Sequence, residues 1–396
     1  MARSNGNIRL QVRTATPSSV RAVNRSIILE LIRRHQPISR ADLARMTGIF
    51  RSSVSDIVDE LVDEELVKEE RATPSGRGRV PMSLQLNDSA HRIVGVNIRP
   101  THCQVACAGL SGRIQETVTF ETPSSPVKLV RAVADAIKRL PEPDRFHRMG
   151  IAVPGHVDAP KGRILWTPTH PELTGFEITQ AMETQTGISA LADNDCNVGA
   201  LSELWLSTED RRTGKSDFVF LNVSDFGAGA GAVLNGRIYL GHDAQFAAEF
   251  GHMVVDRYGP ACRCGRRGCW ELFVSNAATW GRYSSESFST ERFEQLMASA
   301  RTADARALAT LRETADYLSL GISNIAFALN PAEVVVAGRI TAAWELIQHE
   351  VESAYGSPQV RCAVRPARLS ADDSLLHGAV CLALRETFAA PDFGPM

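Results

Sequence analysis

The chain has 396 residues, too many for one ordinary domain and enough to bury a sizeable core. No run approaches the roughly 20 apolar residues that a membrane helix needs, and the N-terminal segment lacks the apolar core of a secretory signal. We therefore expect a globular protein of two or three domains, with no membrane partner and a cytoplasmic location.

The near-neutral total charge of −2 hides a strong local excess of positive charge. Residues 1–55 contain ten arginines, no lysine and only two acids, Glu30 and Asp42, which gives a formal charge of +8. Such a segment favours a polyanion as partner, although a solvated basic tail has the same composition. Residues 1–20 are expected to form a flexible basic tail.

Three short helices are predicted within residues 23–66, where apolar side chains recur at helical spacing. Ser39 is a natural N-cap for a helix that starts at Arg40, Gly48 ends that helix, and the next helix begins near Arg51. Two helices joined by a glycine-containing turn are typical of DNA-binding proteins. In that arrangement the N-terminal residues of the second helix enter the major groove. A plain three-helix bundle with exposed serines is the alternative.

Two short strands joined by a loop at residues 73–78 are predicted after the third helix. A β-hairpin in this place is a wing, and its Gly-Arg-Gly-Arg sequence suits phosphates or a narrow minor groove. Residues 21–88 are thus predicted to be a small α+β winged helix-turn-helix domain. Its candidate DNA-binding residues are Arg40, Arg51, Ser52, Ser53, Ser55, Arg77 and Arg79.

Strands and helices alternate in the remainder of the chain, residues 89–396. The first half of this part is predicted to contain three strands within residues 91–121, a helix at 127–139 and a buried strand ending at Pro154-Gly155. The second half repeats strand, turn and strand within residues 217–241, followed by helices and a strand at 333–337. Two related α/β halves with a cleft between them explain this repetition.

Residues 251–271, GHMVVDRYGPACRCGRRGCWE, contain a group of potential metal ligands. A Cys-x-Cys pair, a third cysteine five residues later and a histidine ten residues before the pair form a Cys₃His set, which is typical of structural zinc. Four protein ligands leave no open position for an activated water, so zinc hydrolysis is not expected. The alternative is a chance grouping without metal. The predicted ligands are His252, Cys262, Cys264 and Cys269.

The order of motifs from about residue 21 onwards resembles the ROK family (repressor, open reading frame, kinase). The motifs are the winged helix, Pro154-Gly155, the Asn-Asp-Cys-Asn sequence at 194–197, a glycine-rich turn at 227–231 and the zinc signature, which is the most specific of them. The resemblance implies an α/β ROK domain at 89–396 with two actin-like, ribonuclease H-like lobes, preceded by the winged helix-turn-helix domain.

The same resemblance implies a sugar site. Carried over residue by residue, the side chains that face the sugar are Asn194, Asp195, Glu249, His252 and Glu271. Carboxylates and amides hydrogen-bond sugar hydroxyls specifically where water is excluded, and zinc would fix His252 and the loop that holds Glu271. Without the family motif, the alternative is that Glu249 and Glu271 are surface carboxylates and that Asn194 and Asp195 form an ordinary turn. Candidates for contacts that distinguish one sugar from another are His156, Thr169 and His170.

In ROK kinases the residue that matches Asp195 is the general base, and an Asp-x-Gly-Gly-Thr motif cradles phosphate. The matching residues here are 97–101, in which Asn97 replaces the acid and Arg99 and Pro100 replace the glycines. Backbone N–H groups approach phosphate closely at glycine, and proline has no N–H. The phosphate cradle is therefore expected to be lost.

Two further kinase motifs are altered. Asp225 and Phe226 stand where the kinases have Gly-Thr, and residues 337–340 keep one of the two glycines used around adenosine. An acid repels phosphate, and a phenyl ring fills space. The nucleotide-binding motifs are altered, whereas all the predicted sugar-binding residues are present. This combination favours a sugar sensor without enzyme activity.

The sequence therefore predicts a sugar-responsive transcriptional repressor of carbohydrate-metabolism genes, with operator DNA and a sugar effector as partners. A homodimer or homotetramer is expected because helix-turn-helix proteins commonly read two half-sites. Two alternatives stay open: a bifunctional ATP-dependent sugar kinase that also binds DNA, and a constitutive DNA-binding protein whose sugar pocket is vestigial or is replaced by a protein partner.

Overall fold

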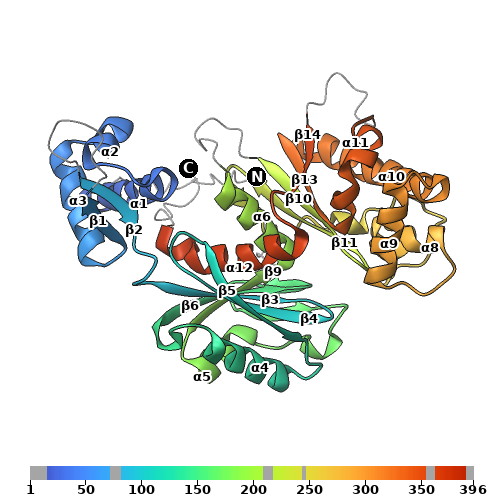
Figure 1. The fold of residues 1–396 in the computed structure, drawn as a ribbon, viewed down its shortest axis with the longest axis horizontal. Helices are drawn as coiled ribbons and strands as arrows, with labels where there is room; N and C mark the ends of the chain where they lie inside the picture. Colours follow the sequence, from blue (N-terminus) through green and yellow to red (C-terminus); the bar gives the residue numbers. More distant parts are fainter. Residues whose placement is uncertain (1–15, 72–81, 208–216, 243–246, 354–361, 389–396) are drawn as a thin grey trace, which may run out of the picture. The chain divides into compact units, whose positions relative to one another are not determined.

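The computed structural model describes residues 16–71, 82–207, 217–242, 247–353 and 362–388, which fall into two compact units (Figure 1). The first unit comprises the described part of residues 1–91 and 385–396, and the second comprises that of residues 92–384. No helix in the described segments is both long and apolar enough to span a bilayer. Arg77, Arg79 and most of the predicted basic tail lie outside the described residues.

The first unit confirms the predicted helices and hairpin strands. Its elements are α1 (Pro17–His35), α2 (Arg40–Thr47), α3 (Arg51–Asp63), β1 (Val67–Arg71) and β2 (Met82–Leu86), with the two strands antiparallel. Ser39 Oγ accepts a hydrogen bond from the Asp42 N–H (3.1 Å), and Gly48 has a φ of 72° after the last turn of α2. Local capping therefore sets the limits of α2 as the sequence predicts.

Helix α1 begins earlier than the predicted end of the tail at residue 20. Thr16 Oγ1 accepts a hydrogen bond from the Ser19 N–H (3.2 Å), and Ser19 Oγ accepts one from the Thr16 N–H (2.8 Å). This reciprocal cap, followed by Pro17 in the first helical position, starts the helix at Pro17. Residues 17–20 thus belong to the first helix.

The second unit contains two five-stranded sheets of equivalent topology, which confirms the prediction of two related halves. In the first sheet the order is β5-β4-β3-β6-β9; β3 to β5 are antiparallel, and β3, β6 and β9 are parallel. Helices α4 and α5 cover one face (Figure 1). The elements are β3 (Arg92–Ile98), β4 (His102–Ala108), β5 (Ile114–Glu121), α4 (Pro126–Arg139), β6 (Phe146–Val153), the hairpin β7 (His156–Asp158) and β8 (Arg163–Trp166), α5 (Ile178–Thr186) and β9 (Ser189–Asn194).

The second sheet has the order β12-β11-β10-β13-β14, again with an antiparallel and a parallel part. Its strands are β10 (Phe218–Val223), β11 (Ala228–Leu234), β12 (Arg237–Ile238), β13 (Glu333–Gly338) and β14 (Ala363–Pro366). The helices on its outer side are α8 (Asn276–Tyr283), α9 (Thr290–Arg301), α10 (Ala305–Leu329) and α11 (Trp344–Ser353) (Figure 1). The short helix α7 (Glu271–Val274) precedes α8.

Helices α6 (Asp195–Leu206) and α12 (Ala371–Phe388) lie between the two sheets (Figure 1). Gly150 of β6 packs against the α12 backbone, since a Cβ there would lie 1.9 Å from the Ala379 carbonyl oxygen. A Cβ at Gly378 would likewise lie 1.9 Å from the Val198 carbonyl oxygen of α6. Glycine therefore permits the close helix–sheet and helix–helix contacts that join the halves.

The predicted glycine-rich turn at 227–231 is wrong in its secondary structure. The turn is formed by residues 224–227, where the Ser224 N–H donates to the Gly227 carbonyl (2.9 Å), and strand β11 begins at Ala228. A Cβ at Gly231 would lie 2.4 Å from the Cys196 carbonyl oxygen of α6. Gly229 and Gly231 thus serve close packing of a strand on a helix, which a local sequence pattern does not distinguish from a turn.

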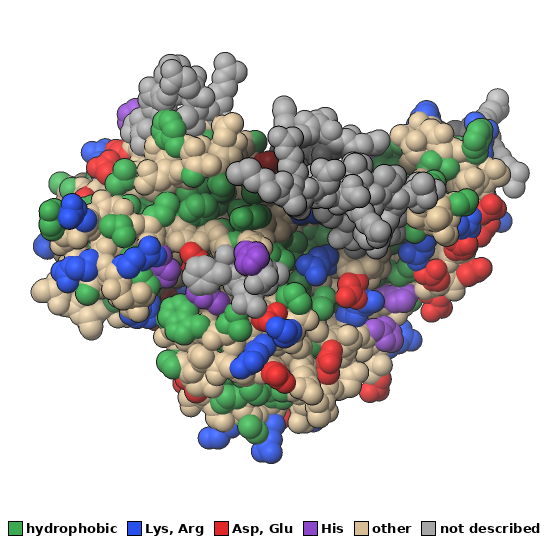
Figure 2. Space-filling view, turned by 180° about the vertical axis from the view of Figure 1, so that it is seen from behind, with side chains coloured by type: hydrophobic (Ala, Val, Ile, Leu, Met, Phe, Trp, Pro, Cys, Tyr) green, Lys and Arg blue, Asp and Glu red, His purple; other side chains and the backbone are tan. Residues whose placement is uncertain are grey.

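Charged side chains of both signs are interspersed over the described surface of the face seen in Figure 2. Asp and Glu side chains gather at the right of this face, whereas the described Lys and Arg side chains form no comparable region on it. The arrangement of particular side chains is therefore a better guide to function here than overall charge.

Candidate functional site

A cavity of about 210 Å³ lies in the second unit, lined from both of its halves. The first half contributes the β3–β4 turn, the Pro154-Gly155 turn and the β7–β8 hairpin, and the second half contributes the β10–β11 turn and residues 249–271. All five side chains predicted to face a sugar line this cavity: Asn194, Asp195, Glu249, His252 and Glu271. We call it the central pocket.

Asn194 ends β9 and caps α6. Its Oδ1 accepts hydrogen bonds from the N–H groups of Cys196 (2.8 Å) and Asn197 (3.2 Å), and its Nδ2 donates to the Gly155 carbonyl (2.8 Å). An asparagine amide has two N–H donors, so one remains for a ligand. Asn194 therefore joins the Pro154-Gly155 turn to the start of α6 and fixes the residue that follows it.

Asp195 is the first residue of α6 and points its carboxylate into the region lined by both halves. Burial raises the pKa of this carboxyl, and the positive charge of Arg99 acts in the opposite direction. The helix N-terminus also favours a negative charge at this position. The site thus holds a carboxyl group that is shielded from bulk water and faces an arginine.

Glu249 is paired across the pocket with the β7–β8 hairpin. Its Oε1 lies 3.1 Å from His156 Nε2, and the His156 ring lies 5.2 Å from that of Trp166, centroid to centroid. Of the residues predicted to distinguish sugars, His156 and Thr169 line the pocket. His170 is buried beside Thr169, with Nδ1 3.3 Å from Thr169 Oγ1, and does not line it.

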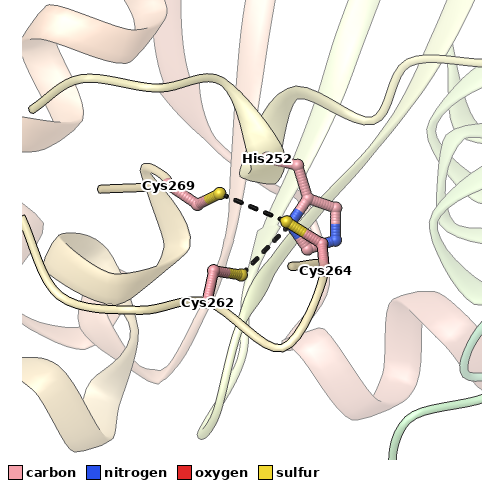
Figure 3. Close-up of side chains that lie close together, drawn as sticks. All are labelled: His252, Cys262, Cys264 and Cys269. Atoms are coloured by element: carbon pink, nitrogen blue, oxygen red, sulfur yellow. Dashed lines mark hydrogen bonds between the residues drawn. The ribbon is translucent and has the colours of Figure 1, made fainter. Parts of the chain in front are cut away.

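The four predicted metal ligands converge on one point (Figure 3). All their ligand atoms lie within 4.8 Å of one another; Cys264 Sγ is 3.5 Å from Cys269 Sγ, and Cys262 Sγ is 3.7 Å from His252 Nδ1. A tetrahedral zinc ion with sulfur at about 2.3 Å and nitrogen at about 2.0 Å has ligand–ligand edges of about 3.5–3.8 Å. The donor set and its spacing therefore fit a metal ion.

The cysteine loop is held by its own backbone and by one buried side chain. The Cys262 N–H donates to the Arg266 carbonyl (2.8 Å), and Gly265 and Gly268 have φ values of 86° and 67°, which glycine adopts without strain. Trp270 is fully buried, and its Nε1 donates to the Tyr317 carbonyl of α10 (2.6 Å). The loop is thus anchored in the core of the second half.

Glu271 connects the metal cluster with the central pocket. Its carboxylate is buried, with Oε1 3.5 Å from His252 Nδ1 and 3.1 Å from Cys262 Sγ. A Cβ at Gly227 would lie 2.9 Å from Glu271 Oε2, so the glycine makes room for the carboxylate at the β10–β11 turn. Cluster geometry and the position of Glu271 therefore depend on each other.

Ion pairs occupy the side of the pocket where the altered kinase motifs lie. Arg99, in the place of a glycine, contacts Asp372 of α12 (3.1 Å). Arg339, just after β13, lies 3.8 Å from Asp225. Asn97 is fully buried and donates from Nδ2 to Gln104 Oε1 (3.0 Å). Charged side chains thus occupy the region in which a phosphate site would need free backbone N–H groups.

The candidate DNA-binding residues differ in their surroundings. Arg51 and Ser52 are exposed in the first turn of α3, whereas Ser53 and Ser55 are half-buried. The Arg40 guanidinium is held by carboxylates of α3 and β1, with Asp59 at 2.7 Å and Glu69 at 3.0 Å. Arg40 thus has carboxylate partners within its own unit, and its contact with DNA stays a prediction.

Phe50 is absent from the predicted DNA-binding set, yet it stands directly before α3 with 83% of its surface exposed. It is the N-cap residue of α3 and makes no side-chain cap hydrogen bond. Serine, threonine, asparagine and aspartate are the preferred N-cap residues, so phenylalanine here forgoes about 1 kcal/mol of helix stability. A phenylalanine at an expected N-cap position is unusual, and this feature of the sequence marks Phe50 as a residue with another role.

Comparison with known proteins places these features in a family. Residues 93–386 match the ROK family, and residues 22–78 match the MarR family. The xylose repressor of Bacillus spizizenii is 28% identical over 349 residues, which are 87% of this chain and 89% of that protein.

Two solved structures show how far the fold is shared. The crystal structure of a ROK family transcriptional regulator, a homolog of the Escherichia coli MLC protein, aligns with a TM-score of 0.76 at 21% identity and covers 93% of this chain and 99% of that one. A ROK family glucokinase from Streptomyces griseus, in complex with glucose and AMPPNP, aligns with a TM-score of 0.64 at 24% identity, over 74% of this chain and 99% of that one. The chain belongs to the ROK family, with a MarR-type winged helix unit before its ROK domain.

Proposed function

We propose that this protein is a sugar-responsive, DNA-binding transcriptional regulator that represses genes of carbohydrate metabolism. One observation carries the proposal. The five side chains predicted to bind sugar hydroxyls line the central pocket, and Arg99 and Asp372 form an ion pair at the predicted phosphate region, in a chain whose residues 22–78 match the MarR family. The similarity to a protein named as a xylose repressor supports it.

The sugar-binding set would combine hydrogen-bond acceptors with donors. The carboxylates of Asp195, Glu249 and Glu271 supply acceptor oxygens for ring hydroxyls, and the remaining N–H of Asn194 supplies a donor. Charge-assisted hydrogen bonds of this kind are roughly twice as strong as neutral ones. A ring of hydroxyls is the ligand class that such a set recognises best.

The metal in the Cys₃His cluster would be zinc in a structural role. Thiolate and imidazole ligands suit zinc, and four protein ligands complete its coordination without an open position for water. Zinc would fix His252 through Nδ1 and leave Nε2 for the ligand side. The ion would thus shape the wall of the pocket and take no part in a reaction.

Sugar binding would regulate DNA binding through two states of the protein. A ligand that contacts both halves of the second unit binds one relative position of those halves best, and it shifts the population towards that state. Two α3 helices of a homodimer, or of a homotetramer built from dimers, would read two operator half-sites whose spacing depends on that state. Acting on operator DNA would place the protein in the cytoplasm.

Replacing Arg51 tests the DNA-reading helix. Arg51→Ala is expected to weaken binding to an operator, selected by the unaltered protein from random duplexes, by about tenfold or more, because a base contact of arginine contributes about 1–3 kcal/mol. Gel shifts measure the change. Arg131→Ala removes the same charge from an exposed position of α4 and should leave operator binding unchanged. Equal operator affinity of Arg51→Ala and the unaltered protein would contradict the placement of α3.

Metal analysis tests the cluster. Purified protein is expected to contain about one zinc ion per chain, and Cys264→Ser should lose most of it and melt at a lower temperature, since binding energy at a structural zinc site contributes to folding. Cys362→Ser, at a cysteine outside the cluster, serves as the matched control. Full zinc content in Cys264→Ser would contradict the ligand assignment.

A phosphorylation assay separates the sensor from the kinase alternative, which the similarity to a ROK glucokinase keeps in view. No hexose is expected to be phosphorylated at the expense of ATP, because Arg99 and Pro100 replace the glycines of the phosphate cradle. ATP-dependent phosphorylation that disappears in Asp195→Asn would show instead that the site is catalytic.

A further inference from the structure

A second cavity, of about 520 Å³, adjoins the central pocket. By the same measure the central pocket holds about 210 Å³. Both cavities are lined by a shared set of residues, namely Arg99, Asn222, Ser224, Asp225 and Arg339. A single sugar ring in the central pocket therefore leaves the larger cavity beside it open.

Two buried amide side chains are among the residues that line the second cavity, and the acceptor atom of each lacks a hydrogen-bond partner. Asn222 of β10 is 3% exposed and Asn276 of α8 is 1% exposed, and the Oδ1 of each has no hydrogen-bond partner among the described residues. Asn276 Nδ2 donates to Asp225 Oδ1 (2.7 Å), which fixes its amide so that the oxygen is the free group. Buried acceptors without donors are costly, so their presence indicates a ligand that donates hydrogen bonds.

The charges around this cavity are balanced already. Arg99 contacts Asp372 (3.1 Å), and Arg339 contacts Glu294 (2.9 Å). Three arginines and three acids line the cavity in all, the third arginine being Arg301. A phosphate would have to displace carboxylates from their arginines, whereas a neutral ligand leaves these pairs intact.

Part of the wall is apolar. Phe293 and Met297 of α9 line the cavity beside the polar groups, and two small residues, Gly338 at the end of β13 and Ala342 after it, also line it. A wall of this kind, with few and placed polar groups, suits a ligand that has both C–H faces and hydroxyls. Hydroxyls both donate and accept hydrogen bonds, so they match the amide oxygens as well as the guanidinium groups.

We propose that the effector is a neutral oligosaccharide, at its smallest a disaccharide. One ring occupies the central pocket, and the next ring lies in the second cavity against Asn222 and Asn276. This inference rests on the proposed function and names the ligand class of that site. It assigns a sugar-binding role to the space whose nucleotide-binding motifs have been replaced.

Isothermal titration of the full-length protein with neutral disaccharides, and with the monosaccharides that compose them, tests the proposal. At least one disaccharide is expected to bind at least about tenfold more tightly than either component, because two buried acceptors gain donors. Equal or tighter binding of the monosaccharides overturns the inference and leaves the proposed function standing. Binding of AMPPNP or of a sugar phosphate in preference to every disaccharide also overturns it. Binding of no sugar of either size contradicts the proposed function itself.

A variant that fills the second cavity gives an independent readout. Ala342→Trp, at an exposed residue that lines the cavity, should reduce disaccharide affinity to the monosaccharide level and leave monosaccharide affinity unchanged. Ala298→Trp, at an exposed position of α9 outside both cavities, is the matched control. Unchanged disaccharide affinity in Ala342→Trp overturns the inference. The affinity ratio of the unaltered protein decides the question even if Ala342→Trp does not fold.

Discussion

The close contact of helix α6 with both halves of the ROK domain is the constraint on which the site depends. Gly231 lets β11 of the second half reach the α6 backbone, and Gly378 lets α12 reach it from the side of the first half. Asn194 then caps α6 and holds the Gly155 carbonyl. The first turn of α6 is therefore fixed relative to loops of both halves, and Asp195 enters the pocket from that turn.

The Cys₃His cluster lies at another wall of the same pocket. His252 and Glu271 are separated by the whole cysteine loop, yet Glu271 Oε1 lies 3.5 Å from His252 Nδ1. Trp270, fully buried and hydrogen-bonded to α10, ties this arrangement to the core. The wall that His252 and Glu271 form is thus held by the core of the second half.

The features that were predicted correctly from the sequence are those that depend on residues close together in the chain. Ser39 and Gly48 set the limits of α2 through a hydrogen bond and a backbone conformation within one turn. The spacing of the cysteines in the sequence was enough to predict that they lie together in a cluster. Contacts between segments that are distant in the sequence were harder to predict. Gly229 and Gly231 were assigned to a turn because their partner, α6, is remote in sequence. The carboxylates that pair with Arg40 also come from other elements, α3 and β1. The second cavity likewise follows from tertiary packing and has no local motif.

In a sugar-responsive repressor, binding of the sugar changes the affinity of the protein for its operator. Fluorescence anisotropy with an operator selected from random duplexes, titrated with and without a saturating sugar, measures that coupling directly. The account predicts that the sugar weakens operator binding by roughly 5- to 150-fold, the usual range of allosteric coupling, and that operator weakens sugar binding by the same factor. A sugar that binds while operator affinity stays the same would contradict it.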